Sequence, residues 1–235
     1  KGGTGAMRFI RIEHGGPDWD DGASEDEESI VNMLTKFKVY SGIPVIMPRS
    51  ADTHRAASLA KYSDEGTPPF VYITGTGEVR MNAADIAALR EYCLNRGGTI
   101  FADSAGRGFG AGFMGLLKEV FPDKQVTDIS SEDSLFSGPF DFSNSYPVFW
   151  EHTGRRIKGI WHQNRWIVIW YPGELNDAWR NGHMGLTAKQ AEDAYKMGAN
   201  IITYAYYNWL HYSEALKGNI APSEAKAKNG VPTDL

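Results

Sequence analysis

Polar residues follow four short apolar runs in this chain, and their types are ones that carry acid–base, nucleophilic or ligand-binding chemistry. The four segments read RFIRIEHGGPDWDDG, FVYITGTGE, TIFADSAGRGFG and WIVIWYPGELND. Each apolar run gives way to Gly beside His, Asp, Thr, Ser or Glu. In an open parallel sheet the carboxyl ends of the strands meet at one edge, and ligands bind there at the point where strand order reverses. We therefore expect the functional site at that edge.

Several residues at these strand ends are candidates for contact with a ligand. The glycines of GTG allow a close backbone approach, although the Gly-Lys-Ser or Gly-Lys-Thr ending of a phosphate loop is missing. Arg107 is placed to hold an anionic substrate in a bidentate contact, or to form a surface salt bridge. Carboxylates after the last run could form an acid–base pair with Asp103, or be solvent-facing turn residues. The candidate ligand-binding residues are Gly15, Gly16, Asp18, Thr76, Gly77, Arg107, Glu174 and Asn176.

An imidazole and three carboxylates lie close together after the first run, at His14, Asp18, Asp20 and Asp21. Such groups bind Zn, Mn, Fe or Ca ions. DWDDG only partly resembles an EF-hand loop, because the further ligands and the closing Glu are not at the required spacing. Acidic residues that solvate the start of the next helix explain the same pattern. The sequence therefore predicts no metal site and no cofactor.

Composition narrows the class of protein. The chain has 235 residues, a net charge of −5 and a pI near 5.7, with Lys and Arg scattered singly. Scattered basic residues on an acidic chain argue against nucleic acid as a partner. No apolar run reaches the roughly 18 residues of a bilayer span, so we expect no transmembrane segment. Cys93, the single cysteine, excludes an intrachain disulfide, and its position on an apolar helix face predicts a buried thiol.

Strand and helix signals alternate along the chain, which is typical of a parallel sheet covered on both faces. Capping-box spacing at Ser24 and Glu27 predicts a helix that ends at Gly42, and the same spacing at Thr187 and Gln190 predicts another. The segment 200–212 is ambiguous between strand and helix, and we favour helix. The expected strands are 8–13, 43–47, 70–74 and 99–102, with a hairpin over 155–171; further helices are expected at 82–97 and 112–121, an irregular crossover at 48–69 and an excursion over the sheet edge at 123–147.

Longer motifs support a specific resemblance. They are RFIRIEHGGPDW, YSGIPV, FVYITGTGEV, LREYCLNRGGTIFADSAG, LLKEVFPD, GIWHQNRWIVIWYPGELND and KMGANIITYAYYN. The chain resembles a bacterial domain family of unknown function with the flavodoxin-like fold of class I glutamine amidotransferases, often envelope-associated. The resemblance implies an α/β domain with a mostly parallel sheet, helices on both faces and an antiparallel hairpin at one edge. It brings no established activity.

The resemblance places Ser104 at the strand-to-helix turn where amidotransferases and hydrolases carry their nucleophile. A serine nucleophile needs a histidine, and His14 is the best placed, with Asp103 as the third candidate catalytic residue. The family pattern has Cys and then His where Ser104 and Ala105 stand, and a His-Pro pair where Ser134-Leu135 is found. Both departures remove groups that activate a nucleophile. In the competing structural interpretation, Asp103 and Ser104 satisfy turn and helix-start amides.

Three functions stay open on this sequence. The first is a ligand-binding domain without glutaminase activity, for a sugar or peptide-like small molecule, since aromatic residues beside carboxylates suit both. The second is a hydrolase or transferase that uses Ser104, and the third is a protein-interaction module. We expect an expression-tag remnant at 1–7, one domain over 8–216 and a loosely held tail at 217–235. A periplasmic or envelope location follows from the resemblance alone.

Overall fold

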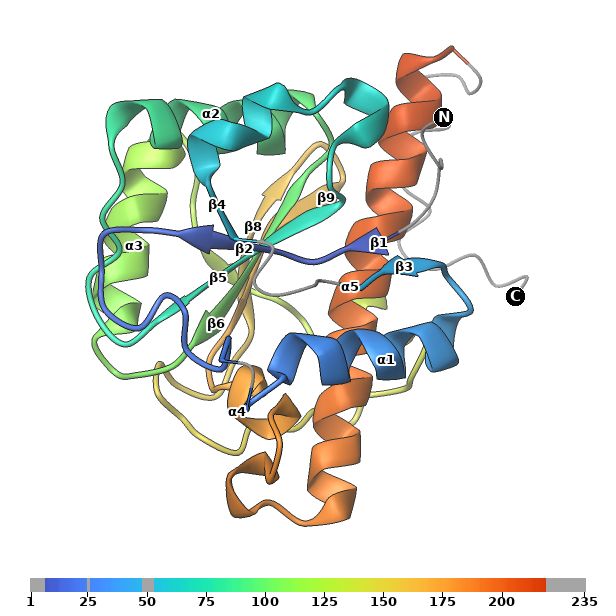
Figure 1. Ribbon diagram of the computed structural model, residues 1–235. Helices are drawn as coiled ribbons and strands as arrows, with labels where there is room; N and C mark the ends of the chain where they lie inside the picture. The colour runs from blue at the N-terminus through green and yellow to red at the C-terminus, as the bar shows by residue number, and fades with distance from the viewer. Residues whose placement is uncertain (1–6, 25, 48–52, 219–235) are drawn as a thin grey trace.

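The computed structural model describes residues 7–24, 26–47 and 53–218, and its centre is a seven-stranded sheet (Figure 1). The strand order is β4-β2-β5-β6-β9-β8-β7. The strands are β4 (Thr53–Arg55), β2 (Ile10–Glu13), β5 (Phe70–Gly75), β6 (Thr99–Ser104), β9 (Arg165–Tyr171), β8 (Lys158–His162) and β7 (Thr127–Asp128). The first five are parallel, and their order along the chain is the 2-1-3-4-5 order of flavodoxin-like folds. The predicted fold class is confirmed.

The expected hairpin forms the antiparallel side of the sheet. β8 pairs with β9, and both residues of the turn between them, Gln163 and Asn164, have positive φ, as tight hairpin turns require. The 123–147 excursion supplies β7, which pairs with β8 at the sheet edge. At the opposite edge the crossover contains β4 and the short helices η1 (Ala56–Lys61) and η2 (Asp64–Gly66), whereas residues 48–52 lie outside the described part.

The first expected strand is split in two. β1 (Met7–Arg8) pairs with β3 (Val45–Ile46) in a separate two-stranded sheet, and β2 continues into the main sheet. Met7, which we expected to belong to a tag, is fully buried in this small sheet. The rest of the expected tag and residues 219–235 of the expected tail lie outside the described residues.

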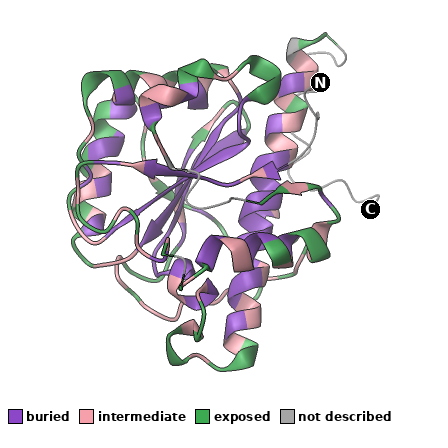
Figure 2. Cartoon of the chain, in the orientation of Figure 1, coloured by how far each residue is buried: buried purple, intermediate pink, exposed green. Residues whose placement is uncertain are grey.

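Helices cover both faces of the sheet (Figures 1 and 2). One buried cluster lies under α2 (Ala83–Asn95) and α3 (Phe109–Val120), and includes Ile100 and Ala102 of β6. The second lies under α1 (Ser29–Ser41), α5 (Ala188–Leu216) and the short α4 (Leu175–Trp179), and includes Phe101. Successive side chains of a strand point to opposite faces, so β6 contributes to both cores. Asp103 therefore points toward α4.

Most predicted helix boundaries are confirmed. The Asn82 side chain accepts from the Asp85 N–H at 2.9 Å, and Thr187 with Gln190 forms the complete capping box of α5, which contains the ambiguous segment 200–212. The predicted capping box at Ser24 is wrong. Among the described residues Ser24 Oγ bonds the Glu27 side chain, and α1 begins at Ser29, whose buried Oγ lies 2.8 Å from Gly22 O and 2.6 Å from Oδ1 of Asn176. The helix starts where the chain is anchored to the interior.

Two further expectations concern single features. Cys93 is fully buried, and burial raises the pKa of its thiol to about 12. Among the helices that the structure describes, none combines the length and apolar character needed to cross a membrane. Two other short helices, η3 (Ser134–Phe136) and η4 (His183–Gly185), lie in the connections that flank the hairpin and α4.

Candidate functional site

Strand order reverses at β2, so the loops after β2 and β5 flank the position where ligands bind in related folds. Here the two loops fill that position themselves. The Gly15 N–H donates to Arg80 O at 2.8 Å, and a Cβ at Gly16 would lie 1.6 Å from Glu78 O. Gly77 packs on the Pro17 ring, since a Cβ there would lie 3.2 Å from its Cγ. These glycines, which we predicted as ligand contacts, serve close packing between loops.

The loop after β6 packs on the same place. A Cβ at Gly108 would lie 2.8 Å from Thr76 O, and one at Gly112 would lie 2.5 Å from Gly77 O. Thr76 itself donates its hydroxyl hydrogen bond to Asp18, whose φ of 57° lies in the left-handed region. The predicted ligand contacts Thr76 and Asp18 therefore tie two loops together at the surface.

His14 is buried beneath these loops, and both of its ring nitrogens are engaged by backbone. Nδ1 accepts from the Gly16 N–H at 3.0 Å, and Nε2 lies 2.7 Å from Thr74 O. A carbonyl can only accept, so the ring is the neutral tautomer with its proton on Nε2. Burial lowers the pKa of His14, the larger effect, and the bond to Thr74 partly offsets it. An imidazole with both nitrogens occupied has none free to activate a serine.

Ser104 is the last residue of β6 and is still paired with Gly75 of β5. The side chain is fully buried, and its Oγ accepts from Trp170 Nε1 at 2.8 Å and donates to Tyr171 O at 3.1 Å. Thr153 Oγ1 is a third neighbour at 2.9 Å. The hydrogen-bonding capacity of a hydroxyl is one donor and two acceptor sites, so these partners exhaust it. The expected strained elbow is replaced by regular strand.

Asp103 is fully buried and holds the start of α4. Its Oδ1 accepts from the Leu175 N–H and its Oδ2 from the Asn176 N–H, both at 3.0 Å, and the Tyr72 hydroxyl donates to Oδ2 at 2.7 Å. Burial raises the pKa of Asp103 to about 7, although these hydrogen bonds act in the opposite direction. Asp103 thus accepts hydrogen bonds from helix-start amides, as the structural interpretation predicted. The helix is α4, about 70 residues further along the chain, and not the helix that directly follows β6.

A cluster of three carboxylates gathers at the same edge: Asp21 from the loop after β2, Glu174 from the loop after β9, and Asp177 from α4. One oxygen of each lies within 4.8 Å of the others. Burial, then the contact with Asp21, raises the pKa of Glu174, and burial raises that of Asp177. His152 Nε2 lies 3.5 Å from Glu174 Oε2, and Arg180 lies 3.2 Å from Asp177 and 3.8 Å from Asp21. We name Asp21, Glu174 and Asp177 the acidic cluster.

Asn176 and Arg11 are buried next to the acidic cluster. The Asn176 amide donates to Asp21 O at 3.0 Å, and its carbonyl accepts from Ser29 Oγ at 2.6 Å and from Arg11 at 3.4 Å. Arg11 is 1% exposed, and its guanidinium lies 5.0 Å from the Tyr72 ring. Sequence reasoning missed Arg11, although a charge between Ile10 and Ile12 of an apolar strand is itself a signal, because a buried arginine needs partners.

The structure separates the four residues that the sequence analysis weighed as a metal-binding group. Asp21 joins carboxylates from the other end of the chain, whereas Asp18 bonds Thr76 and His14 bonds Thr74. Arg107 is exposed in the turn before α3, and no ion pair between it and the described residues is seen. Its charge acts on His152, where burial and then Arg107 lower the pKa of the imidazole.

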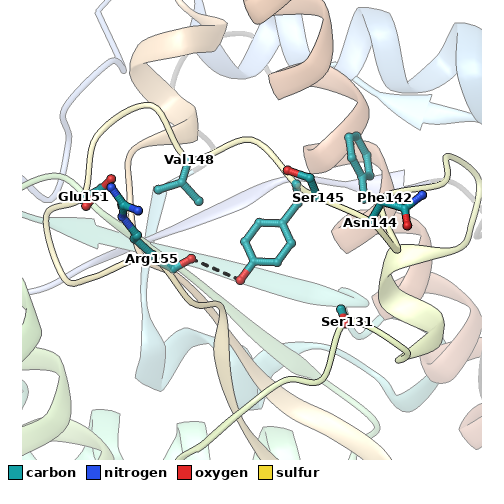
Figure 3. A pocket seen from close by; sticks show the side chains of 8 residues that line it. Ser131, Phe142, Asn144, Ser145, Val148, Glu151 and Arg155 are labelled. Atoms are coloured by element: carbon teal, nitrogen blue, oxygen red, sulfur yellow. Dashed lines mark hydrogen bonds and ion pairs between the residues drawn. The ribbon is translucent and has the colours of Figure 1, made fainter.

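A surface hollow lies elsewhere and contains none of the predicted site residues. It has a volume of about 330 Å³ and is built from the connection between β7 and β8 (Figure 3). The Tyr146 hydroxyl donates to Arg155 O at 3.2 Å, and Arg155 pairs with Glu151 at 2.7 Å. Phe142 and Val148 add apolar surface. This hollow is open and mixed in character, and the groups with unusual electrostatics lie at the acidic cluster instead.

The strand order, the two helical layers and the polar edge define a flavodoxin-like α/β domain. The chain belongs to a domain family of unknown function, DUF4159, whose model matches residues 8–206. No curated protein matches the chain. The match covers the whole sheet and most of α5, so the family is defined by the scaffold that positions the acidic cluster.

Proposed function

We propose that this chain is a ligand-binding domain without glutaminase activity, whose site lies at the carboxyl edge of the sheet. The observation that carries the proposal is the saturation of Ser104: Oγ has three partners, and none of them is a base. A nucleophilic serine requires a general base in contact with its hydroxyl. The predicted base, His14, has both ring nitrogens hydrogen-bonded to backbone groups. The alternative hydrolase or transferase function is therefore the less favoured one.

The finer parts of the proposal concern scaffold and setting. We propose an amidotransferase-like scaffold that has lost its catalytic groups, in a bacterial envelope protein. The 2-1-3-4-5 strand order supports the scaffold, and the Ser104-Ala105 pair in place of Cys and His supports the loss. The ligand is a small species that presents positive charge to the acidic cluster, because Glu174 holds a buried oxygen, Oε1, with no hydrogen-bond partner among the described residues.

Two measurements test this function. We expect no ammonia release from glutamine and no hydrolysis of acyl esters by the wild-type domain. Release that disappears in Ser104→Ala would overturn the proposal, since it would give Ser104 the role of nucleophile. In parallel, a thermal-shift screen of amino sugars, cationic peptides and polyamines compares the wild type with Glu174→Gln, and stabilisation present in the first and absent in the second locates the site.

The protein-interaction module is a second candidate, and the hollow in Figure 3 favours it. Phe142, Tyr146 and Val148 offer apolar contacts beside the Glu151–Arg155 ion pair, the mixture that peptide ligands use. If the thermal-shift screen gives no stabilisation in any variant, Tyr146→Ala in a binding assay with candidate envelope proteins becomes the deciding experiment.

A further inference from the structure

We propose that Asp21, Glu174 and Asp177 bind one hard divalent cation of the Mn²⁺, Mg²⁺ and Ca²⁺ class, with His152 beside the ion. The inference rests on the proposed function, because it names the ligand class taken at the same edge of the sheet. The acidic cluster combines three segments that are far apart in sequence: the loop after β2, the loop after β9 and the first turn of α4. Folding therefore assembles the site.

The spacing of the cluster fits one shared ion. Carboxylate oxygens bind Ca²⁺ at about 2.4 Å, so two oxygens on one ion lie at most about 4.8 Å apart. One oxygen each of Asp21, Glu174 and Asp177 lies within 4.8 Å of the others. A cation can thus contact all three with little movement of the side chains. Oxygen ligands from carboxylates are the ones that hard divalent cations prefer.

An unpartnered buried group provides the second, independent observation. The Glu174 side chain is 5% exposed, and its Oε1 has no hydrogen-bond partner among the described residues. Oδ1 of Asp177, by contrast, lies 3.2 Å from the guanidinium of Arg180. A buried carboxylate oxygen without a partner is strongly unfavourable, so native structures give such an atom a donor or a cation. One carboxylate oxygen of Glu174 lies within 4.8 Å of an oxygen of Asp21 and of Asp177, so the group faces the cluster.

Neighbouring cations do not neutralise the cluster. Arg180 contacts Asp21 and Asp177, but its shortest contact, at 2.7 Å, is to Glu27 outside the cluster. Arg11 donates to Trp19 O and to Asn176, and none of its described hydrogen bonds goes to a carboxylate. Each arginine thus also forms hydrogen bonds or ion pairs with groups outside the three carboxylates. A divalent cation supplies the positive charge that balances the carboxylates of the acidic cluster.

His152 adds a ligand of a different kind. Its Nε2 lies 3.5 Å from Glu174 Oε2, and its side chain is 25% exposed. An imidazole nitrogen at this position can contact the ion or donate a hydrogen bond to a ligating carboxylate. A nitrogen beside three carboxylates favours Mn²⁺ over Ca²⁺ and Mg²⁺, because imidazole is a softer ligand than oxygen.

Titration of EDTA-treated and dialysed full-length chain with Mn²⁺ tests the inference, with calorimetry and the loss of the free Mn²⁺ spectrum in electron paramagnetic resonance as readouts. We expect one saturable ion per chain and a rise in melting temperature. Glu174→Gln and Asp177→Asn should each weaken binding by at least about 100-fold, and His152→Ala by about tenfold. Asp20→Asn is the matched control, because Asp20 is an exposed carboxylate next to Asp21 and outside the cluster.

Each outcome of the titration either supports or overturns the metal-binding inference. Absence of saturable Mn²⁺, Mg²⁺ and Ca²⁺ binding would overturn the inference and leave a shared proton as the group that holds Glu174 against Asp21 and Asp177. Equal weakening by Asp20→Asn and Glu174→Gln would also overturn it, since it would show attraction by charge alone. If the metal-free Glu174→Gln variant does not fold, Asp177→Asn carries the same comparison. Failure of the metal test leaves the glutaminase result untouched, so the two proposals fail separately.

Discussion

The indole Nε1–H of Trp170 donates a 2.8 Å hydrogen bond to Oγ of Ser104, across the pair of neighbouring parallel strands β9 and β6. This bond explains why a serine is compatible with a buried strand end. A buried indole needs an acceptor, and a hydroxyl that accepts from it can still donate to the Tyr171 carbonyl. Ser104, the candidate nucleophile of the sequence analysis, thus holds two strands together.

The Ser104–Trp170 bond gives a stability prediction. Ser104→Ala leaves the buried indole N–H without this acceptor, which lowers the unfolding free energy by about 1–3 kcal/mol. Trp170→Phe removes the donor and also leaves space, and the double variant removes both partners. In urea unfolding, we expect the sum of the two single-variant losses in unfolding free energy to exceed the loss in the double variant by about 1 kcal/mol. Strictly additive losses would contradict a direct interaction.

His14 gives a prediction for nuclear magnetic resonance. Its ring should be the Nε2–H tautomer, and it should stay neutral below its ordinary pKa of 6.5 because burial lowers that pKa. The unfolded chain takes up a proton below about pH 6.5 and the native ring resists it, so this group's contribution to stability is lost as pH falls through that range. Long-range ¹H–¹⁵N spectra between about pH 7.5 and about pH 5 measure both properties. A ring that titrates near 6.5 would contradict its burial.

Local signals in the sequence predicted the elements well. Asn82 before a helical pattern, the Thr187–Gln190 pair and the hairpin within 155–171 each have a short-range physical cause, and each is where it was expected. The start of α1 was missed because its anchor is not local. Ser29 is held by Asn176, whose position in the sequence says nothing about the first helix.

At the candidate site, too, local features could be predicted from the sequence and long-range contacts could not. Strand-end reasoning brought His14, Asp103 and Ser104 to one sheet edge, but it could not predict which partners occupy their polar atoms. Those partners come from residues such as Trp170, far along the chain, and depend on register between strands. The acidic cluster was hidden for the same reason, since Asp21 meets Glu174 only after β2 and β9 take their places in the sheet.

Two glycines offer a matched pair of substitutions. Gly16→Ala puts a Cβ 1.6 Å from Glu78 O, and the backbone there must move, so we expect a loss of about 1–3 kcal/mol in unfolding free energy. Gly115→Ala in α3 meets no atom within 4 Å, and alanine is favoured over glycine in a helix by about 1 kcal/mol. Urea unfolding of both variants should therefore give shifts of opposite sign. Equal shifts would contradict the close packing of the loops after β2 and β5.

Cys93 provides a test of core integrity. Burial raises the pKa of its thiol to about 12, so the native chain should not react with an aromatic disulfide reagent at about pH 8. One thiol per chain should react after denaturation in guanidinium. Rapid reaction of the native chain would mean that α2 opens easily from the sheet, and the same assay on Gly16→Ala separates a local disturbance of the loops from global unfolding.

Asp103 gives a second prediction about pH, opposite in sign to that for His14. Burial raises its pKa to about 7 in the native chain, whereas the unfolded chain releases this proton near its ordinary value of 3.8. Between these values the native state binds more protons, so the contribution of Asp103 to stability falls as pH rises from about 4 to about 7. Asp103→Asn cannot titrate. It also places an amide group against one of the N–H groups of Leu175 and Asn176, at a cost of about 1–3 kcal/mol.

The two effects together predict a difference that changes with pH. At about pH 5 the wild type should exceed Asp103→Asn in unfolding free energy, and the gap should narrow at about pH 7.5 because only the wild type loses its protonated carboxyl. Titration of His14 occurs in both proteins and cancels in the difference, because Asp103 is not among the groups that shift the pKa of His14. Urea unfolding at the two pH values measures the gap. A gap that widens with pH would mean that hydrogen bonds from Tyr72 and α4 outweigh burial, and that Asp103 is held as a carboxylate.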